Sequence, residues 1–170
     1  MNSTKIQKER KRKHQKVDDT KSLYSNIEIG STYYTKNQVL GMGSFGIAMV
    51  CYVNPTNESC VVKIVNLDQS KHKSPEKILG REVEIFKELS VHKLLLPHLV
   101  QMYALTKFRN KENHLCHALV MEYAGQDLDK ILASRNEYSF RPAQLFEIGL
   151  HLLPALEAMH RCGVVHQDIK

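Results

Sequence analysis

The chain has 170 residues, 42% of them hydrophobic and 25% charged, which is typical of a globular protein with a substantial buried core. It holds no apolar run near the ~20 residues that cross a bilayer, and because its first twenty residues are densely charged we expect no secretory signal there. Residues 1–16 contain seven of the 24 Lys and Arg residues and one of the 18 acids. They account for the whole net charge of +6, so the remainder is not a basic nucleic-acid-binding surface.

Residues 1–30 are predicted to be a basic, disordered tail. The run 5–16 fits three interpretations: a nuclear-import signal, an arm for an anionic partner, or a solvated leader with no partner. The four cysteines are scattered without a Cys-x-x-Cys pair, so we expect reduced thiols and no metal site. These features indicate an intracellular protein, in the cytoplasm, the nucleus or both, with no membrane and no specific nucleic acid as partner.

The first regular elements are expected to be strands. Aromatic and β-branched residues fill 32–41, 47–53 and 60–65, and turn-forming residues separate the last two. Between the first two lies G-x-G-x-x-G, a spacing shared by two phosphate-binding devices. A dinucleotide-binding unit needs a helix that begins at the glycines, but only strand-like residues follow them. The sequence therefore favours a glycine loop between two strands.

The second part of the chain alternates between strand and helix patterns. Residues 74–89 have helix-start chemistry, with Ser74 as the expected N-cap and Pro75 in the first turn. Two apolar runs, 99–105 and 117–123, are predicted strands, and 124–134 changes to helical spacing. The long helix expected at 142–160 is apolar nearly all round, which is typical of a buried helix, and Pro154 should bend it.

Residues 34–170 resemble the amino-terminal half of the eukaryotic protein kinases of the Ser/Thr type. The family's elements occur in order: a glycine loop, a strand lysine, a helix glutamate, a hinge and a catalytic loop. The resemblance implies an α+β, protein kinase-like fold. A five-stranded antiparallel sheet with one helix would form the N-lobe and hinge at 31–124, and 125–170 would begin an incomplete helical C-lobe. The subfamily stays open between casein kinase-like and cyclin-dependent kinase-like.

The same resemblance implies a site for ATP. Lys63 would hold the α- and β-phosphates, and Met121 would be the gatekeeper before the hinge. Ala48 and Val61 exchange the Val and Ala that the family usually has, which roughly conserves pocket volume. Asp127 would either contact the ribose or cap the next helix. The residues expected to bind the nucleotide are Leu40, Gly41, Gly43, Ser44, Phe45, Gly46, Ala48, Val61, Lys63, Met121, Glu122, Tyr123, Ala124 and Asp127.

Four residues are expected to carry the catalytic function. Lys63 needs a partner, because an unpaired ammonium among apolar neighbours is costly, and the resemblance implies that this partner is Glu82. Glu84, two residues on, would face another side of the helix. By the resemblance, Asp168 would orient a protein hydroxyl and accept its proton late in transfer. Lys170 would balance charge on the γ-phosphate and favours a Ser/Thr over a Tyr kinase.

The resemblance also sets limits on this chain. In the family, the side chains that hold the two Mg²⁺ ions follow the position of Lys170, so metal ligands are expected beyond the C-terminus. The isolated chain is therefore predicted to be inactive. Two readings stay open: the front half of a kinase that acts on a protein substrate, or a truncated or pseudokinase chain that binds nucleotide or a partner without catalysis. Gln167 replaces the usual Arg, which makes activation by a loop phosphate doubtful.

Overall fold

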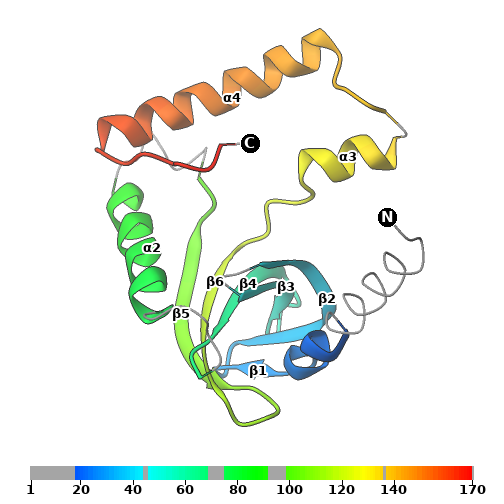
Figure 1. The fold of residues 1–170 in the computed structure, drawn as a ribbon, viewed down its shortest axis with the longest axis vertical. Coiled ribbons are helices and arrows are strands. Elements are labelled where there is room, and N and C mark those ends of the chain that lie inside the picture. The colour runs from blue at the N-terminus through cyan, green and yellow to red at the C-terminus, as the bar shows by residue number, and fades with distance from the viewer. Residues whose placement is uncertain (1–17, 44–45, 69–74, 92–98, 136, 170) are drawn as a thin grey trace, which may run out of the picture. The chain divides into compact units, whose positions relative to one another are not determined.

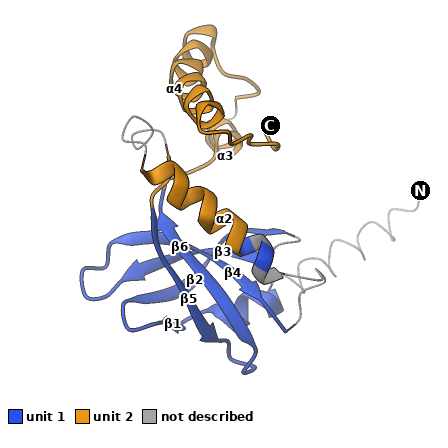
Figure 2. Ribbon diagram, turned by 90° about the vertical axis from the view of Figure 1, so that its left-hand side faces the viewer, with its two compact units in different colours: residues 1–79, 102–123 blue, residues 80–101, 124–170 orange. Residues whose placement is uncertain are grey.

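The computed structural model describes residues 18–43, 46–68, 75–91, 99–135 and 137–169. The basic run 5–16 and four single residues with predicted roles lie outside the described residues: Ser44, Phe45, Ser74 and Lys170. The chain divides into two compact units, which are coloured separately in Figure 2. Residues 1–79 and 102–123 form the first unit, and residues 80–101 and 124–170 form the second.

The first unit is built on a six-stranded antiparallel sheet with the order β1-β2-β3-β4-β6-β5 (Figure 1). The two edge strands, β1 and β5, contact each other, so the sheet curls around its core. The strands are β1 (Glu28–Ile29), β2 (Tyr33–Gly43), β3 (Gly46–Val53), β4 (Ser59–Asn66), β5 (Met102–Arg109) and β6 (Leu115–Glu122). The five predicted strands are thus confirmed, and β1 is an addition to them.

One face of the sheet forms the hydrophobic core. Alternate residues of a strand share a face, so every second residue of β3, β4 and β6 enters this core. Most of these side chains have no exposed surface at all. The core residues of these three strands are Ile47, Met49, Cys51, Cys60, Val62, Ile64, Cys116, Ala118 and Val120. The side chains between them point to the opposite face of the sheet and are not part of this core.

The N-terminal segment differs from the prediction of a tail up to residue 30. Residues 18–24 are helical, β1 follows them, and Tyr24 and Ile29 are buried in the core. Thr35 of β2 holds this segment: its hydroxyl donates to the backbone oxygen of Tyr24 and accepts from the backbone N–H of Ile27 at 3.1 Å. The prediction was wrong for residues 18–30, because a few apolar side chains are enough to anchor a polar segment on a sheet.

Three helices are described in full: α2 (Pro75–Ser90), α3 (Leu128–Ser134) and α4 (Pro142–Arg161). In α2, Leu79, Val83 and Leu89 are buried. The helix crosses the boundary between the units, since Leu79 belongs to the first and Gly80 to the second, whereas the prediction placed all of it in the N-lobe. Within the described ranges, no helix is long and apolar enough to cross a membrane.

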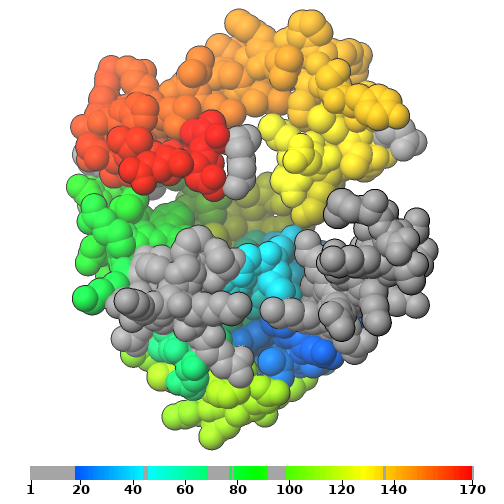
Figure 3. All heavy atoms as spheres, viewed as in Figure 1, coloured from blue at the N-terminus to red at the C-terminus, as the bar shows by residue number. Residues whose placement is uncertain are grey.

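Helix α4 forms where it was predicted, but it contains no buried residue. The helix continues past Pro154 to Arg161, although proline has no backbone N–H to donate. Leu153 and Phe146 are 68% and 70% exposed, and the atoms of α4 lie open at the surface in Figure 3 (orange to red). The apolar pattern of α4 is typical of a buried helix, but helical apolarity alone does not supply the partner that would cover it.

Candidate nucleotide-binding site

The glycine loop joins β2 to β3 and is itself part of the ladder. Gly43 pairs with Gly46, and Gly41 pairs with Ala48 after an irregularity that follows Val39. Gly46 has φ +133°, and a Cβ there would lie 2.0 Å from the backbone oxygen of Ile64 in β4. No other residue fits this position, so Gly46 is required by the packing of the sheet.

Gly41 and Gly43 have a different environment. Both are exposed, and a Cβ built on either meets nothing within 4 Å. Their lack of a side chain therefore serves no contact within the described part of the chain. It leaves bare backbone beside the hairpin, which a ligand can approach closely.

The strand register brings four of the predicted nucleotide-binding residues to one face of the sheet. Ala48 of β3 lies opposite Lys63 of β4, and Val61 of β4 lies opposite Met121 of β6. Directly opposite residues share a face, as do residues two apart in one strand. All four residues are half-buried, whereas Val62 and Val120 on the other face are fully buried. The face thus combines apolar side chains with one ammonium group.

Two further residues of this face are closed to solvent. Val50, opposite Val61, is 2% exposed, and Leu119, opposite Lys63, is 0% exposed. Lys63 therefore lies in a largely apolar surrounding, in which a charged group needs compensation by an opposite charge.

Strand β6 leads out of the sheet at the predicted hinge. Met121, Glu122 and Tyr123 are half-buried, and Ala124, the next residue, is exposed and begins the second unit's stretch 124–170. Glu122 still pairs with Cys60 of β4, so the ladder ends as the predicted hinge begins. The backbone groups of Tyr123 and Ala124 follow the last pair of the ladder and can meet the edge of a base.

Asp127 caps α3. Its Oδ1 accepts from the backbone N–H of Lys130 at 2.8 Å, and its Oδ2 lies 2.8 Å from the Lys130 ammonium. These contacts with Lys130, the side-chain hydrogen bond first, lower the pKa of Asp127. Of the two roles that the sequence left open, the structure contains the cap, and a contact with the ribose stays a prediction.

The remaining predicted catalytic residues belong to the second unit. Glu82 is half-buried on α2, whereas Glu84 is exposed and pairs with Arg81 at 3.5 Å. Asp168 is exposed, and its backbone N–H donates to Nδ1 of His166 at 3.2 Å. The intervening Gln167 has a positive φ of 63°, so the segment turns sharply before Asp168. Glu82 and Asp168 thus belong to the second unit, whereas Lys63 belongs to the first. That they act together with Lys63 stays a prediction.

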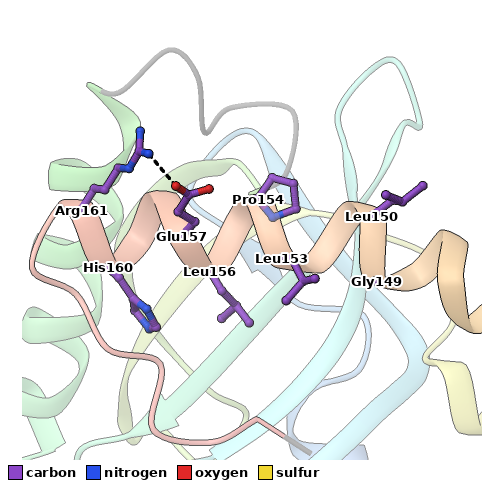
Figure 4. A pocket seen from close by; sticks show the side chains of 8 residues that line it. All are labelled: Gly149, Leu150, Leu153, Pro154, Leu156, Glu157, His160 and Arg161. Carbon is purple, nitrogen blue, oxygen red and sulfur yellow. Dashed lines mark hydrogen bonds and ion pairs between the residues drawn. The ribbon is translucent and has the colours of Figure 1, made fainter.

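The second unit also contains an apolar groove that no sequence pattern pointed to. It measures about 790 Å³ and is lined by residues of α4 alone (Figure 4). An ion pair of 2.5 Å between Arg161 and Glu157 lies beside it. None of the predicted nucleotide-binding or catalytic residues lines this groove. The lining residues are Gly149, Leu150, Leu153, Pro154, Leu156, Glu157, His160 and Arg161.

Comparison with known proteins identifies the family. A family model of the protein kinase domain matches residues 34–170, so the chain belongs to the protein kinase family. The chain is 31% identical over 150 residues, 88% of its length, to a carbon catabolite-derepressing protein kinase of Candida glabrata, of which it covers 22%. It is 30% identical over 137 residues, 81% of its length, to cyclin-dependent kinase D-1 of Arabidopsis thaliana, of which it covers 31%. A serine/threonine-protein kinase of the same plant is 26% identical over 155 residues, 89% of this chain and 31% of that relative.

The matches confirm the predicted kinase fold class and family, and they leave the subfamily open, because relatives of several kinds match at similar identity. The chain spans about a fifth of the length of the first curated relatives that it matches, at 22% and 21%.

Proposed function

We propose that this chain forms the ATP-binding part of a protein serine/threonine kinase, which in the complete protein transfers the γ-phosphate of ATP to a protein hydroxyl. One observation carries the proposal: the strand register gathers Ala48, Val61 and Lys63 on one face beside the open glycine hairpin. Membership of the protein kinase family supports the reaction class.

The residues present fit the chemistry of ATP. An adenine ring needs flat apolar contacts, which Ala48, Val61 and Met121 offer from three adjacent strands. The edge of the base needs hydrogen-bonding groups, which the backbone of residues 122–124 supplies. The phosphates need close backbone approach and a positive charge, and Gly41 and Lys63 offer these on the same side of the hairpin.

Lys63 is proposed to act together with Glu82. The lysine lies among apolar side chains, so a carboxylate partner would hold its ammonium charged and fix its direction. Glu82 is half-buried on α2, whereas its rival Glu84 is exposed. Glu82 is therefore the better candidate.

Asp168 and Lys170 are proposed to act on the protein substrate. Asp168 is exposed, so its carboxylate can accept a hydrogen bond from a serine or threonine hydroxyl and take up the proton. Lys170 would offset negative charge beside it. ATP, when bound, supplies the phosphoryl group. Among the described residues, no group of three or more His, Cys, Asp and Glu side chains is arranged to hold a metal ion.

The two faces of the sheet provide the test of ATP binding. Titration of the isotope-labelled chain with Mg²⁺ and a non-hydrolysable ATP analogue should shift the NMR signals of Gly41, Ala48, Val61 and Met121. The methyl groups of Val62, on the core face of the same strand, should shift much less. Shifts confined to α4, or none at millimolar nucleotide, would contradict the proposal.

A further inference from the structure

Two cysteines face each other in the core beneath the candidate site. Cys51 of β3 and Cys60 of β4 are directly paired across the antiparallel ladder, and neither has any exposed surface. Both are free thiols, and their Sγ atoms lie 2.8 Å apart in a thiol–thiol hydrogen bond. The pair is thus close enough for the sulfurs to react with each other.

The ladder geometry suits a covalent bond between them. Directly opposite residues of an antiparallel pair have Cα atoms about 4.5–5.5 Å apart. Disulfides span Cα distances of about 4.4–6.8 Å, so the bond needs little backbone movement. We propose that Cys51 and Cys60 form a redox modification site, at which a peroxide converts the thiol pair into a disulfide that ties β3 to β4.

The reaction balances with a peroxide as the only oxidant. The Cys60 thiolate attacks one oxygen of hydrogen peroxide, the O–O bond breaks, and the hydroxide that leaves takes up the thiol proton to form water. The resulting sulfenic acid is attacked by Cys51, a sulfur–sulfur bond forms, and a second water leaves with the Cys51 proton. Two thiols are oxidised and one peroxide is reduced to two waters.

The electrostatics of the pair support this order of events. The hydrogen bond from Cys51 lowers the pKa of Cys60, while the same bond and burial raise the pKa of Cys51. A lowered thiol pKa increases the fraction of thiolate, which is the form that attacks peroxide. This direction favours Cys60 as the thiol that reacts first and Cys51 as the thiol that resolves the sulfenic acid.

Access to the buried pair is provided by the end of the β3–β4 hairpin. Ser59, which precedes Cys60, is exposed, and so is the whole turn 54–58. Local opening of such a hairpin end costs much less than global unfolding, and a peroxide molecule is small. The other buried thiol of this core, Cys116 of β6, is paired with Asn66 of β4 in the ladder and has no cysteine opposite it.

The test is oxidation of the folded, full chain followed by blocking of free thiols and peptide mapping. Hydrogen peroxide should remove two hydrogen atoms from the intact mass and link the peptides of Cys51 and Cys60. The oxidised form should melt about 5–10 °C higher, because a disulfide that closes a short loop restricts the unfolded chain. A dithiol reductant should reverse both changes. Cys162→Ser serves as the background, since that cysteine is half-exposed and could join two chains.

Cys60→Ala should abolish the link and the rise in melting temperature, whereas the matched control Cys116→Ala should keep both. If Cys60→Ala does not fold, peptide mapping of the oxidised chain without this substitution still shows whether Cys51 and Cys60 are linked. Two results would overturn the proposal: both thiols remaining free after prolonged exposure of the folded chain, or a disulfide that joins any other pair.

Discussion

Gly46 begins β3 at a point where a Cβ would meet the backbone of β4, and the sequence motif does not reveal this. The motif does not distinguish its three glycines from one another. In the structure, however, only Gly46 of the three combines a positive φ with a backbone oxygen at the place that a Cβ would occupy. Gly41 and Gly43 have open space at the same position. Two separate demands, packing and ligand approach, therefore produce one motif.

This difference predicts opposite effects of two similar substitutions. Gly46→Ala should lower the free energy of unfolding by at least about 2 kcal/mol, because the methyl group adds strain and a backbone clash. Gly41→Ala should change it by less than about 1 kcal/mol and should weaken nucleotide binding instead. Urea unfolding measures the first effect. Equal losses of stability in the two variants would show that the structural distinction is wrong.

Thr35 is a second residue whose role depends on a single atom. It is 1% exposed, and its hydroxyl joins β2 to the segment that contains Tyr24 and Ile27. Thr35→Val keeps the shape but leaves a buried carbonyl and N–H without this partner, which should cost about 1–3 kcal/mol of unfolding free energy. Thr35→Ser, which keeps the hydroxyl, should cost less. Thermal unfolding of the two variants checks this, and a Ser variant as unstable as the Val variant would argue against the hydrogen bond.

At the scale of the elements, helix α3 begins with a side-chain N-cap, Asp127. The pKa of Asp127 is lowered by Lys130, so the carboxylate stabilises the helix start at neutral pH. Because the pKa of Asp127 is lower in the folded than in the unfolded chain, its contribution to stability is fully present above the unfolded-state pKa. It is lost as the pH falls through the folded-state pKa. Amide exchange at Lys130, whose N–H meets the cap, should quicken relative to the intrinsic rate below about pH 4. Asp127→Asn, which caps without titrating, should remove this pH dependence, and its persistence would assign it to another group.

Most elements could be predicted because they follow one local rule. The strands β2, β3, β4, β5 and β6 have apolar or β-branched runs, and α2 and α4 have helical spacing with a proline in the first turn. Strand β1 could not be predicted, because it has only two residues, which pair with Tyr33 and Tyr34 of β2. The apolar pattern of α4 is typical of a buried helix, yet α4 has no buried residue here, because exposure depends on what packs against a helix.

The candidate site was predictable in its residue types but not in its geometry. The motif pointed to Ala48, Val61 and Lys63, yet only the strand register shows that they share one face with Met121. Register depends on turns and bulges such as the irregularity after Val39, which no local pattern reveals.

At the scale of the whole molecule, the proposed function draws on residues that belong to both units. Lys63 belongs to the sheet unit and Glu82 to the other unit, so their pairing can be tested as an energetic coupling. Lys63→Met and Glu82→Gln should each weaken nucleotide binding, and the double variant should lose much less than the sum of the two. Glu84→Gln, two residues along the same helix, should show no such coupling with Lys63→Met. If the losses of binding free energy in Lys63→Met and Glu82→Gln were strictly additive in the double variant, the two residues would act independently and the proposed pairing would be wrong.

The most direct test of ATP binding on the Lys63 face of the sheet is the nucleotide dissociation constant by calorimetry. Lys63→Met should raise it about 10- to 100-fold, because a charge-assisted contact is worth about 1.5–3 kcal/mol. Lys107→Met removes another lysine of the same sheet, opposite His117 of β6, and should leave the constant unchanged. An unchanged affinity in Lys63→Met, or an equal loss in both variants, would contradict the account.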